Sequence, residues 1–297
     1  MSGANWSLCK IAAFTVLLTA QLSHAAVSVT DDAQRKVTLN KPAQRIISLA
    51  PHTTELLFEA GAGALIVGVS DYSDYPEAAK KIAPIGNVFA LDLERIIALK
   101  PDLIVIWGTG NAKTLANKLR DTAIPVFESE PHQYEDIASS IERLAILTGN
   151  AETGKIAAEK FRNRLEKLRQ TYLLTDKQKP VSVFYQIARK PLMTLNDQHM
   201  VSAAIRLCGG QNIFGSLKEI SPTVTAEAVL VANPDVIITG SGDKQDVFAD
   251  WRQFSNMTAI KKDHLFTVEG DWLNRSGPRI LDGTEMLCKH LATARAK

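Results

Sequence analysis

The sequence predicts an α/β protein with two similar lobes, each with a central parallel sheet, joined by one long rigid α-helix with a ligand cleft between the lobes. Short apolar strands alternate with helices on both sides of a single uninterrupted helical segment, a pattern typical of parallel sheets covered by helices. One strand-and-helix pattern also occurs twice in the chain. The length of 297 residues is enough for two lobes of roughly 100–150 residues each.

The first 25 residues have the pattern of a secretory signal peptide. Lys10 precedes an uncharged apolar run at residues 11–22, and small residues at Ser23 and Ala25 form a cleavage site. The run is shorter than the roughly 20 residues that cross a bilayer, which disfavours the alternative of an uncleaved anchor. Cys9 lies before the run, where a lipid anchor would not be attached. We expect a mature protein that is exported.

The N-terminal lobe is predicted over residues 26–149. It should begin with a small hairpin at 27–39, because polar and apolar residues alternate there. Apolar runs at 45–49, 66–69, 103–106 and 125–127 predict buried strands, since parallel strands are covered on both faces. Helical spacing with terminal Gly or Pro predicts helices from Thr53 to Gly61 and at 93–99, 113–121 and 134–148.

The linking helix is predicted within residues 150–178, and the C-terminal lobe within 179–297. Residues 151–172 contain no Gly or Pro after Gly154, so a helix there would be about 30 Å long. The strand–helix alternation resumes with a strand at 181–185. Residues 93–104 and 226–237, 133 positions apart, share a glutamate, a short apolar helix, a Pro-Asp turn and a strand, which indicates an internal duplication.

The composition excludes several classes of protein. The chain has 45% hydrophobic and 22% charged residues, which is typical of a globular protein, and its net charge of +2 gives no basic surface for nucleic acid. Cleavage of the signal peptide would leave two cysteines, Cys208 and Cys288. They form either a disulfide, which an oxidising compartment favours, or two separate buried thiols.

No motif of a known catalytic site is present, such as GxSxG, a P-loop or HExxH. A secreted α/β enzyme remains a hypothesis that would require a nucleophile and a base in the cleft. His52 and His199 are expected near strand ends in the two lobes. A direct metal binder using both is another alternative, although no local spacing supports coordination, and we expect no metal site.

Several aromatic and charged residues follow predicted strands and should face the cleft. Trp107 and Trp272 are expected to stack on a large planar ligand, and Asp271 and Arg275 to bond its polar groups. The further aromatic candidates are Tyr72, Tyr75 and Phe89. For Tyr75, which precedes Pro76, packing in the core is an equally good interpretation.

Five segments, residues 45–51, 68–76, 93–102, 207–214 and 271–279, together closely resemble the periplasmic cobalamin-binding proteins of ABC importers. The broader group is the helix-linked (class III) substrate-binding proteins, which also carry haem, ferric siderophores and metals. The resemblance implies a monomer that performs no chemistry and holds no cofactor, capturing cobalamin or a related corrinoid between its lobes. The same fold binding haem or a ferric siderophore is the alternative.

The resemblance also implies roles for particular residues. Glu94 and Glu227 would dock into arginine pockets on the permease dimer at the inner membrane, and Cys208 and Cys288 would form the family's disulfide. The ligand-binding residues implied are Tyr72, Trp107, Asp271, Trp272 and Arg275, together with Phe89. The chain departs from the family where tryptophans can precede the two glutamate motifs, because it has Val88-Phe89 and Ser221-Pro222 there.

Overall fold

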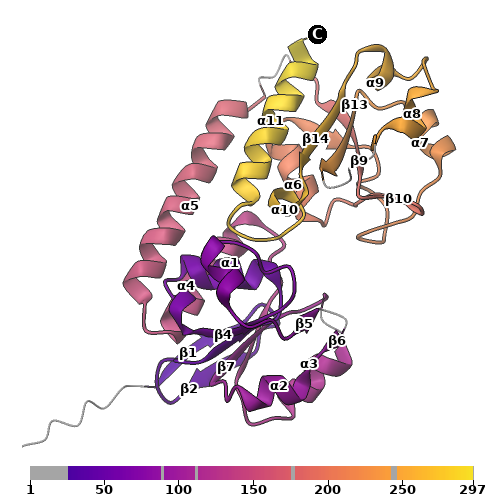
Figure 1. The fold of residues 1–297 in the computed structure, drawn as a ribbon. Coiled ribbons are helices and arrows are strands. Elements are labelled where there is room, and N and C mark those ends of the chain that lie inside the picture. Colours follow the sequence, from indigo (N-terminus) through magenta and orange to yellow (C-terminus); the bar gives the residue numbers. More distant parts are fainter. Residues whose placement is uncertain (1–25, 88–89, 111–112, 175–177, 242–245, 297) are drawn as a thin grey trace, which may run out of the picture.

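The computed structural model describes residues 26–87, 90–110, 113–174, 178–241 and 246–296. Two α/β lobes are joined along one side by the long helix α5 (Ala151–Tyr172), as Figure 1 shows. This confirms the predicted fold class. The predicted signal peptide at residues 1–25 and Phe89 lie outside the described residues. Within the described part of the chain, no helix is long and apolar enough to cross a membrane.

The N-terminal lobe is built on a parallel sheet with the strand order β4-β3-β7-β8. Its strands are β3 (Ile46–Ser48), β4 (Ile66–Val69), β7 (Leu103–Trp107) and β8 (Val126–Ser129). Its helices are α1 (Pro51–Glu59), α2 (Leu93–Ala98), α3 (Lys113–Arg120) and α4 (Tyr134–Leu147). The predicted hairpin is formed by β1 (Val27–Thr30) and β2 (Lys36–Leu39), and a second short pair by β5 (Gly86–Asn87) and β6 (Ala90–Leu91).

The C-terminal lobe repeats this arrangement with the strand order β12-β9-β13-β14, again all parallel. Its strands are β9 (Val181–Gln186), β12 (Gly210–Asn212), β13 (Val236–Ser241) and β14 (Leu265–Glu269), with a short antiparallel pair of β10 (Ala188–Arg189) and β11 (Leu192–Met193). Its helices are α6 (Met200–Leu207), α7 (Ala226–Ala232), α8 (Ala249–Arg252), α9 (Thr258–Lys261), α10 (Gly270–Leu273) and α11 (Ile280–Ala296). The loop expected around Trp272 is therefore the short helix α10.

The two lobes share the same strand order and the same hydrogen bonding of an equivalent Pro-Asp turn, as the predicted duplication implies. In each sheet, the second strand in the chain lies at one edge, and the first, third and fourth follow it in order. Asp102 accepts hydrogen bonds from the backbone of Gln44 and Arg45, which lead into β3, at 2.8 and 2.9 Å. The equivalent Asp235 accepts from the backbone of Ser182 in β9 at 2.9 Å. The Pro-Asp turn thus attaches the third strand of each sheet to the first.

The strands are buried on both faces, as their apolar runs predict. In β7, Leu103 and Val105 belong to a core that extends through both lobes and α5, whereas Ile104 and Ile106 pack into a separate cluster on the other face of the sheet. Alternate side chains of a strand point to opposite faces, so a continuous apolar run serves two cores.

Helix α5 packs closely against α4 and less extensively against α11. A Cβ atom added to Gly154 would lie 2.2 Å from the Cβ of Ala145, so only glycine permits this approach to α4. Farther along α5, Phe161, Leu165 and Leu168 are buried in the core shared by the lobes. Because α5 is packed along its length against both lobes, it forms a rigid connection between them and does not act as a free hinge.

A disulfide joins Cys208, at the end of α6, to Cys288 in α11. This confirms the pairing implied by the family resemblance. The bridge connects two helices that pack on the same side of the C-terminal sheet, and its cysteines are fully buried. Both belong to the main apolar core.

Candidate ligand cleft

A cavity of about 490 Å³ lies between the lobes. Its N-terminal wall comes from the carboxyl ends of β3, β7 and β8 and the segments that follow them, and its C-terminal wall from the segments at the start of α6, before α7 and after α10. Its lining comprises Pro51, His52, Trp107, Thr109, Glu130, Pro131, His132, Gln198, His199, Met200, Ile220, Ser221, Asn274, Arg275 and Ser276. Carboxyl ends of parallel strands are where open α/β sheets bind ligands, so the topology places the candidate site here.

Trp107 is the aromatic candidate that lines this cleft. Its Nε1 donates to Glu130 Oε1 at 3.4 Å, and the backbone N of Thr109 donates to Glu130 Oε2 at 2.6 Å. A Cβ atom added to Gly110 would lie 1.8 Å from the Trp107 ring, so the backbone packs directly on the indole. The His52 ring packs against it in a T-shaped arrangement, with ring centroids 5.7 Å apart. The indole is therefore held in one orientation.

Arg275 is the second predicted site residue in the cleft wall. Its guanidinium pairs with Asp271, one turn earlier, at 2.9 Å and with Asp74 of the N-terminal lobe at 2.9 Å. Partial burial raises the pKa of Asp74, but the hydrogen bond and charge of Arg275 outweigh this and lower it overall. Arg275 therefore links the lobes in addition to facing the cleft.

A buried ionic contact between the lobes lies beside Arg275. Glu55, in α1, is only 2% exposed and accepts hydrogen bonds from Arg279 Nε at 3.1 Å and Nη2 at 2.7 Å. Its Oε1 is also 3.5 Å from Arg275 Nη1. The Arg279 guanidinium lies over the ring of Tyr75, 4.1 Å from the centroid. Tyr75 thus contacts the opposite lobe, and neither a core position nor a free ligand contact describes it.

The remaining predicted ligand residues are arranged differently. Tyr72, Asp271 and Trp272 do not line the cavity of the cleft. Tyr72 is 77% exposed, and its φ of 65° is a left-handed conformation that residues other than glycine rarely adopt. Trp272 is half-buried in α10, beside Asp271. The structure therefore brings Trp107 and Arg275 together in the cleft wall, with Asp271 bonded to Arg275 from outside it.

Three histidines also line the cleft. Burial lowers the pKa of His52 to about 4, and among the described residues its Nε2 has no hydrogen-bond partner. Burial lowers the pKa of His199 to about 4 as well, and the charge of His132 acts in the same direction. His199 Nδ1 accepts a hydrogen bond from Val201 N at 3.1 Å, which leaves Nε2–H as a donor in the neutral ring.

No group of three or more His, Cys, Asp or Glu side chains in the described part of the chain could hold a metal ion. His52 and His199 reach the cleft as expected. However, His199 caps α6 through Nδ1, and the His52 ring packs against Trp107. The geometry therefore does not favour the alternative of a direct metal binder.

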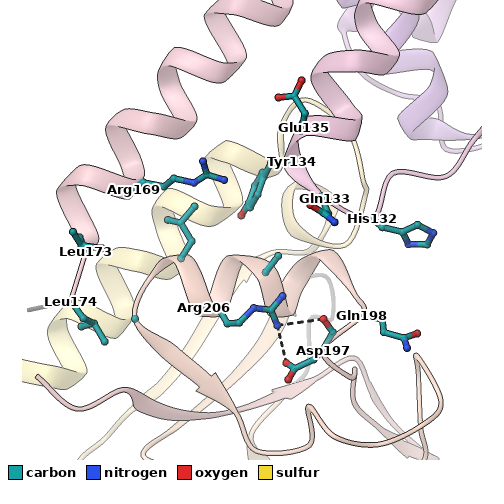
Figure 2. A pocket seen from close by; sticks show the side chains of 13 residues that line it. His132, Gln133, Tyr134, Glu135, Arg169, Leu173, Leu174, Asp197, Gln198 and Arg206 are labelled. Atoms are coloured by element: carbon teal, nitrogen blue, oxygen red, sulfur yellow. Dashed lines mark hydrogen bonds and ion pairs between the residues drawn. The ribbon is translucent and has the colours of Figure 1, made fainter. Parts of the chain in front are cut away.

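A larger cavity of about 1000 Å³ lies between the start of α4, the end of α5 and α6 (Figure 2). Figure 2 shows Arg169 and Arg206 extending into it, with Arg206 paired to Asp197. Its other acid, Glu135, pairs with Arg162. Its lining contains two arginines and two acids, so the formal charges of these side chains cancel and favour neither an anionic nor a cationic ligand. This cavity also lies between the lobes and shares His132 and Gln198 with the cleft, but none of the ligand residues predicted from the sequence lines it.

The two lobes, the linking helix and the interlobe cleft define a two-lobed binding protein, and the sequence agrees. The chain belongs to the family of periplasmic binding proteins, which it matches over residues 46–271. The vitamin B12-binding protein of Vibrio cholerae serotype O1 is 40% identical over 258 residues, covering 86% of this chain and 91% of that protein. This family consists of binding proteins, and membership overturns the alternative of a secreted enzyme.

Solved structures agree with this assignment. The periplasmic vitamin B12-binding protein of Vibrio cholerae has a TM-score of 0.80 and 39% identity, with 86% of this chain and 99% of that chain covered. A periplasmic haem-binding protein of Roseiflexus has a TM-score of 0.75 at 21% identity, with 85% and 99% covered, and shares the fold alone.

Reasoning from sequence did not find Glu55 and did not assign a role to Asp74 or Arg279. Asp74 and Arg279 lie in the segments that carry the family resemblance, but each has its partner on the other lobe, Arg275 for Asp74 and Glu55 for Arg279. Glu55 lies one turn before the exposed Glu59 on α1, and its burial beside two arginines was not encoded in the local pattern. An acid within a buried stretch is the signal that could have found it, because such acids are rarely buried without a partner.

Proposed function

We propose that this protein captures cobalamin or a related corrinoid in the interlobe cleft and delivers it to the permease of an ABC importer. The observation that carries the proposal is a cleft between the lobes, with the fixed indole of Trp107 on the N-terminal wall and the guanidinium of Arg275 on the C-terminal wall. The 40% identity to a vitamin B12-binding protein, over 91% of that relative, supports the same ligand.

The proposed ligand contacts differ in how firmly they are held. Trp107 is fixed by Glu130 and Gly110 and offers a flat surface for a corrin ring. Asp271 and Asp74 orient the guanidinium of Arg275, which places its N–H groups at the wall of the cleft as hydrogen-bond donors for a ligand. We assign Tyr72 and Trp272 to outer contacts of a ligand that extends beyond the cavity, together with Phe89, which lies outside the described residues. The strained backbone at Tyr72 supports a functional role there.

Ser221 lines the cleft where a relative could carry a tryptophan before the second glutamate motif. A small side chain at this position leaves more room and removes a stacking surface. We therefore expect this protein to tolerate corrinoids with differing peripheral groups, relying on Trp107 for most of its stacking energy.

Glu94 and Glu227 are the proposed docking residues. They occupy the second position of α2 and α7, and both side chains are exposed. We propose that each docks into a basic pocket on one subunit of a permease dimer at the inner membrane. The mature protein is proposed to begin after residue 25 and to act as a periplasmic monomer, in keeping with the periplasmic location of the Vibrio cholerae protein.

The test is calorimetric titration of the purified mature protein with cyanocobalamin, for which we expect one site per chain. Trp107→Ala should weaken binding by about tenfold or more, since an aromatic contact of this size contributes on the order of 1 kcal/mol beyond its buried area. Leu173→Ala, in the larger cavity, is the matched control and should bind normally.

The alternatives give different results in the same experiment. Loss of binding in Leu173→Ala with full binding in Trp107→Ala would place the ligand in the other cavity. Tight binding of haem with a shifted Soret band, and no binding of cyanocobalamin, would replace the corrinoid by haem. Binding of a ferric siderophore alone would be seen as a ferric charge-transfer band.

A further inference from the structure

Helices α2 and α7 are fixed at both ends in the same way. At the N-terminal end, Asp92 accepts a hydrogen bond from Arg95 N at 2.9 Å, and the equivalent Thr225 accepts from Ala228 N at 3.2 Å. At the C-terminal end, Lys100 and the equivalent Asn233 both adopt left-handed conformations, with φ of 47° and 44°. These caps and turns hold two short helices in defined positions, one on each lobe.

Each helix is anchored by one buried residue and exposes another apolar residue. Ile96 and its equivalent Val229 are fully buried. Ile97 follows Glu94 by three positions and is 49% exposed, and Val231 follows Glu227 by four positions and is 87% exposed. Residues three or four apart share one face of a helix. Each glutamate is therefore accompanied on its exposed face by an apolar side chain about one turn away.

A single exposed apolar residue needs no explanation on a soluble protein. Here an acid and an exposed apolar side chain about one turn away occur on both copies of a duplicated helix, three positions apart in α2 and four positions apart in α7, and both helices are capped. Val231 is also the most exposed of the large apolar residues in the described part of the chain. An exposed apolar residue beside an acid suits a protein–protein contact in which an ion pair is shielded from water by neighbouring apolar side chains.

We infer that Ile97 and Val231 are apolar docking contacts, each inserting beside its glutamate into the periplasmic surface of one permease subunit. This inference rests on the proposed function and deepens it. The partner surface it requires is a basic group flanked by an apolar depression, present once on each of two identical subunits. The apolar contact excludes water from the ion pair, so docking depends less on salt than it would through glutamates alone.

The experiment measures binding of the mature protein to its purified cobalamin importer in lipid nanodiscs, at low and high salt. It is run with and without bound cyanocobalamin, so docking is scored independently of ligand capture. Ile97→Ser and Val231→Ser are compared with Glu94→Gln and Glu227→Gln. Ile156→Ser is the matched control, because Ile156 is 58% exposed on α5, away from both docking helices.

We expect Ile97→Ser and Val231→Ser each to weaken docking by about three- to tenfold, the effect of losing one buried aliphatic side chain. Cyanocobalamin affinity and thermal midpoint should stay unchanged, and the salt dependence should become steeper. The glutamate variants should weaken docking and flatten its salt dependence. Ile156→Ser should match the unmodified protein.

Two results would overturn the inference, and they are distinguishable. Normal docking of Ile97→Ser and Val231→Ser, with weakened docking of the glutamate variants, refutes the apolar contact and leaves the proposed docking residues in place. Normal docking of all four variants refutes both the apolar contact and the docking role of Glu94 and Glu227. Failure to bind cyanocobalamin refutes the proposed ligand, and docking of the unliganded protein still decides the role of Ile97 and Val231.

Discussion

Replacing Glu55 by alanine removes the buried carboxylate that joins the two lobes. Glu55 accepts two hydrogen bonds from Arg279, at 2.7 and 3.1 Å, and is 2% exposed. Among the described residues it is the only acid that forms an ion pair with Arg279. Its loss leaves a largely buried guanidinium without its hydrogen-bonded carboxylate, while Asp74 and Asp271 act on it only through their charge.

Breaking a buried ion pair by removing one partner costs about 3–5 kcal/mol, because the remaining charge is left uncompensated. For a chain of this size, about 2 °C of thermal midpoint corresponds to each kcal/mol, which predicts a decrease of roughly 6–10 °C for Glu55→Ala. The measurement is thermal unfolding of the mature protein followed by circular dichroism at neutral pH.

The matched control is Asp246→Ala, which removes a carboxylate from an exposed pair with Arg252 at 2.9 Å. Both partners are about half exposed, so we expect a loss below about 1 kcal/mol and a midpoint change below about 2 °C. If Glu55→Ala lowers the midpoint no more than Asp246→Ala does, the buried contact between the lobes does not contribute to stability and our reasoning is refuted.

Three further predictions concern pH, the disulfide and the cleft. The pKa of His52 is about 4 in the folded protein and near 6.5 in the unfolded chain, so the contribution of the neutral ring to stability is lost as the pH falls through this window. Between pH 8 and pH 5, the free energy of unfolding measured by urea denaturation should therefore drop by about 2 kcal/mol more than it does in His52→Asn. Equal drops in the two proteins would contradict this assignment. Reduction of Cys208–Cys288, or replacement of both by serine, should cost on the order of 4 kcal/mol in the same assay, and an unchanged urea midpoint would refute that stabilisation. Gly110→Ala should displace the Trp107 indole and weaken cyanocobalamin binding about tenfold by calorimetry, whereas normal affinity would mean that the indole does not contact the ligand.

Much of the fold was predictable because its signals are local. Apolar runs of three to five residues locate most of the central strands, though not β14, and the uninterrupted segment at 151–172 locates α5 at its observed bounds. The duplication predicted equivalent elements in the two lobes, and the common strand order confirms it. Short elements such as α8, α9 and β12 were not predicted, because three or four residues carry too little periodicity.

The candidate site was predictable only in part. Trp107 and Arg275 line the cleft because a residue just after a strand or a terminal helix turn is placed by local geometry. Tyr72, in the loop after β4, and Trp272, in the short helix α10, lie outside the cavity. The direction of such a side chain depends on how the lobes approach each other, and no local pattern records that.

By itself, the sequence determined the lobes, the linking helix, the duplicated acidic helices and the family, since all of these follow from periodicity, turn residues and motifs within short stretches. Only the tertiary structure decided which charges meet. Glu55 and Arg279 are 224 positions apart, and Asp74 and Arg275 are 201 apart. Their contacts exist because α5 holds the two lobes in one relative position, and burial at that junction makes each acid depend on an arginine from the other lobe.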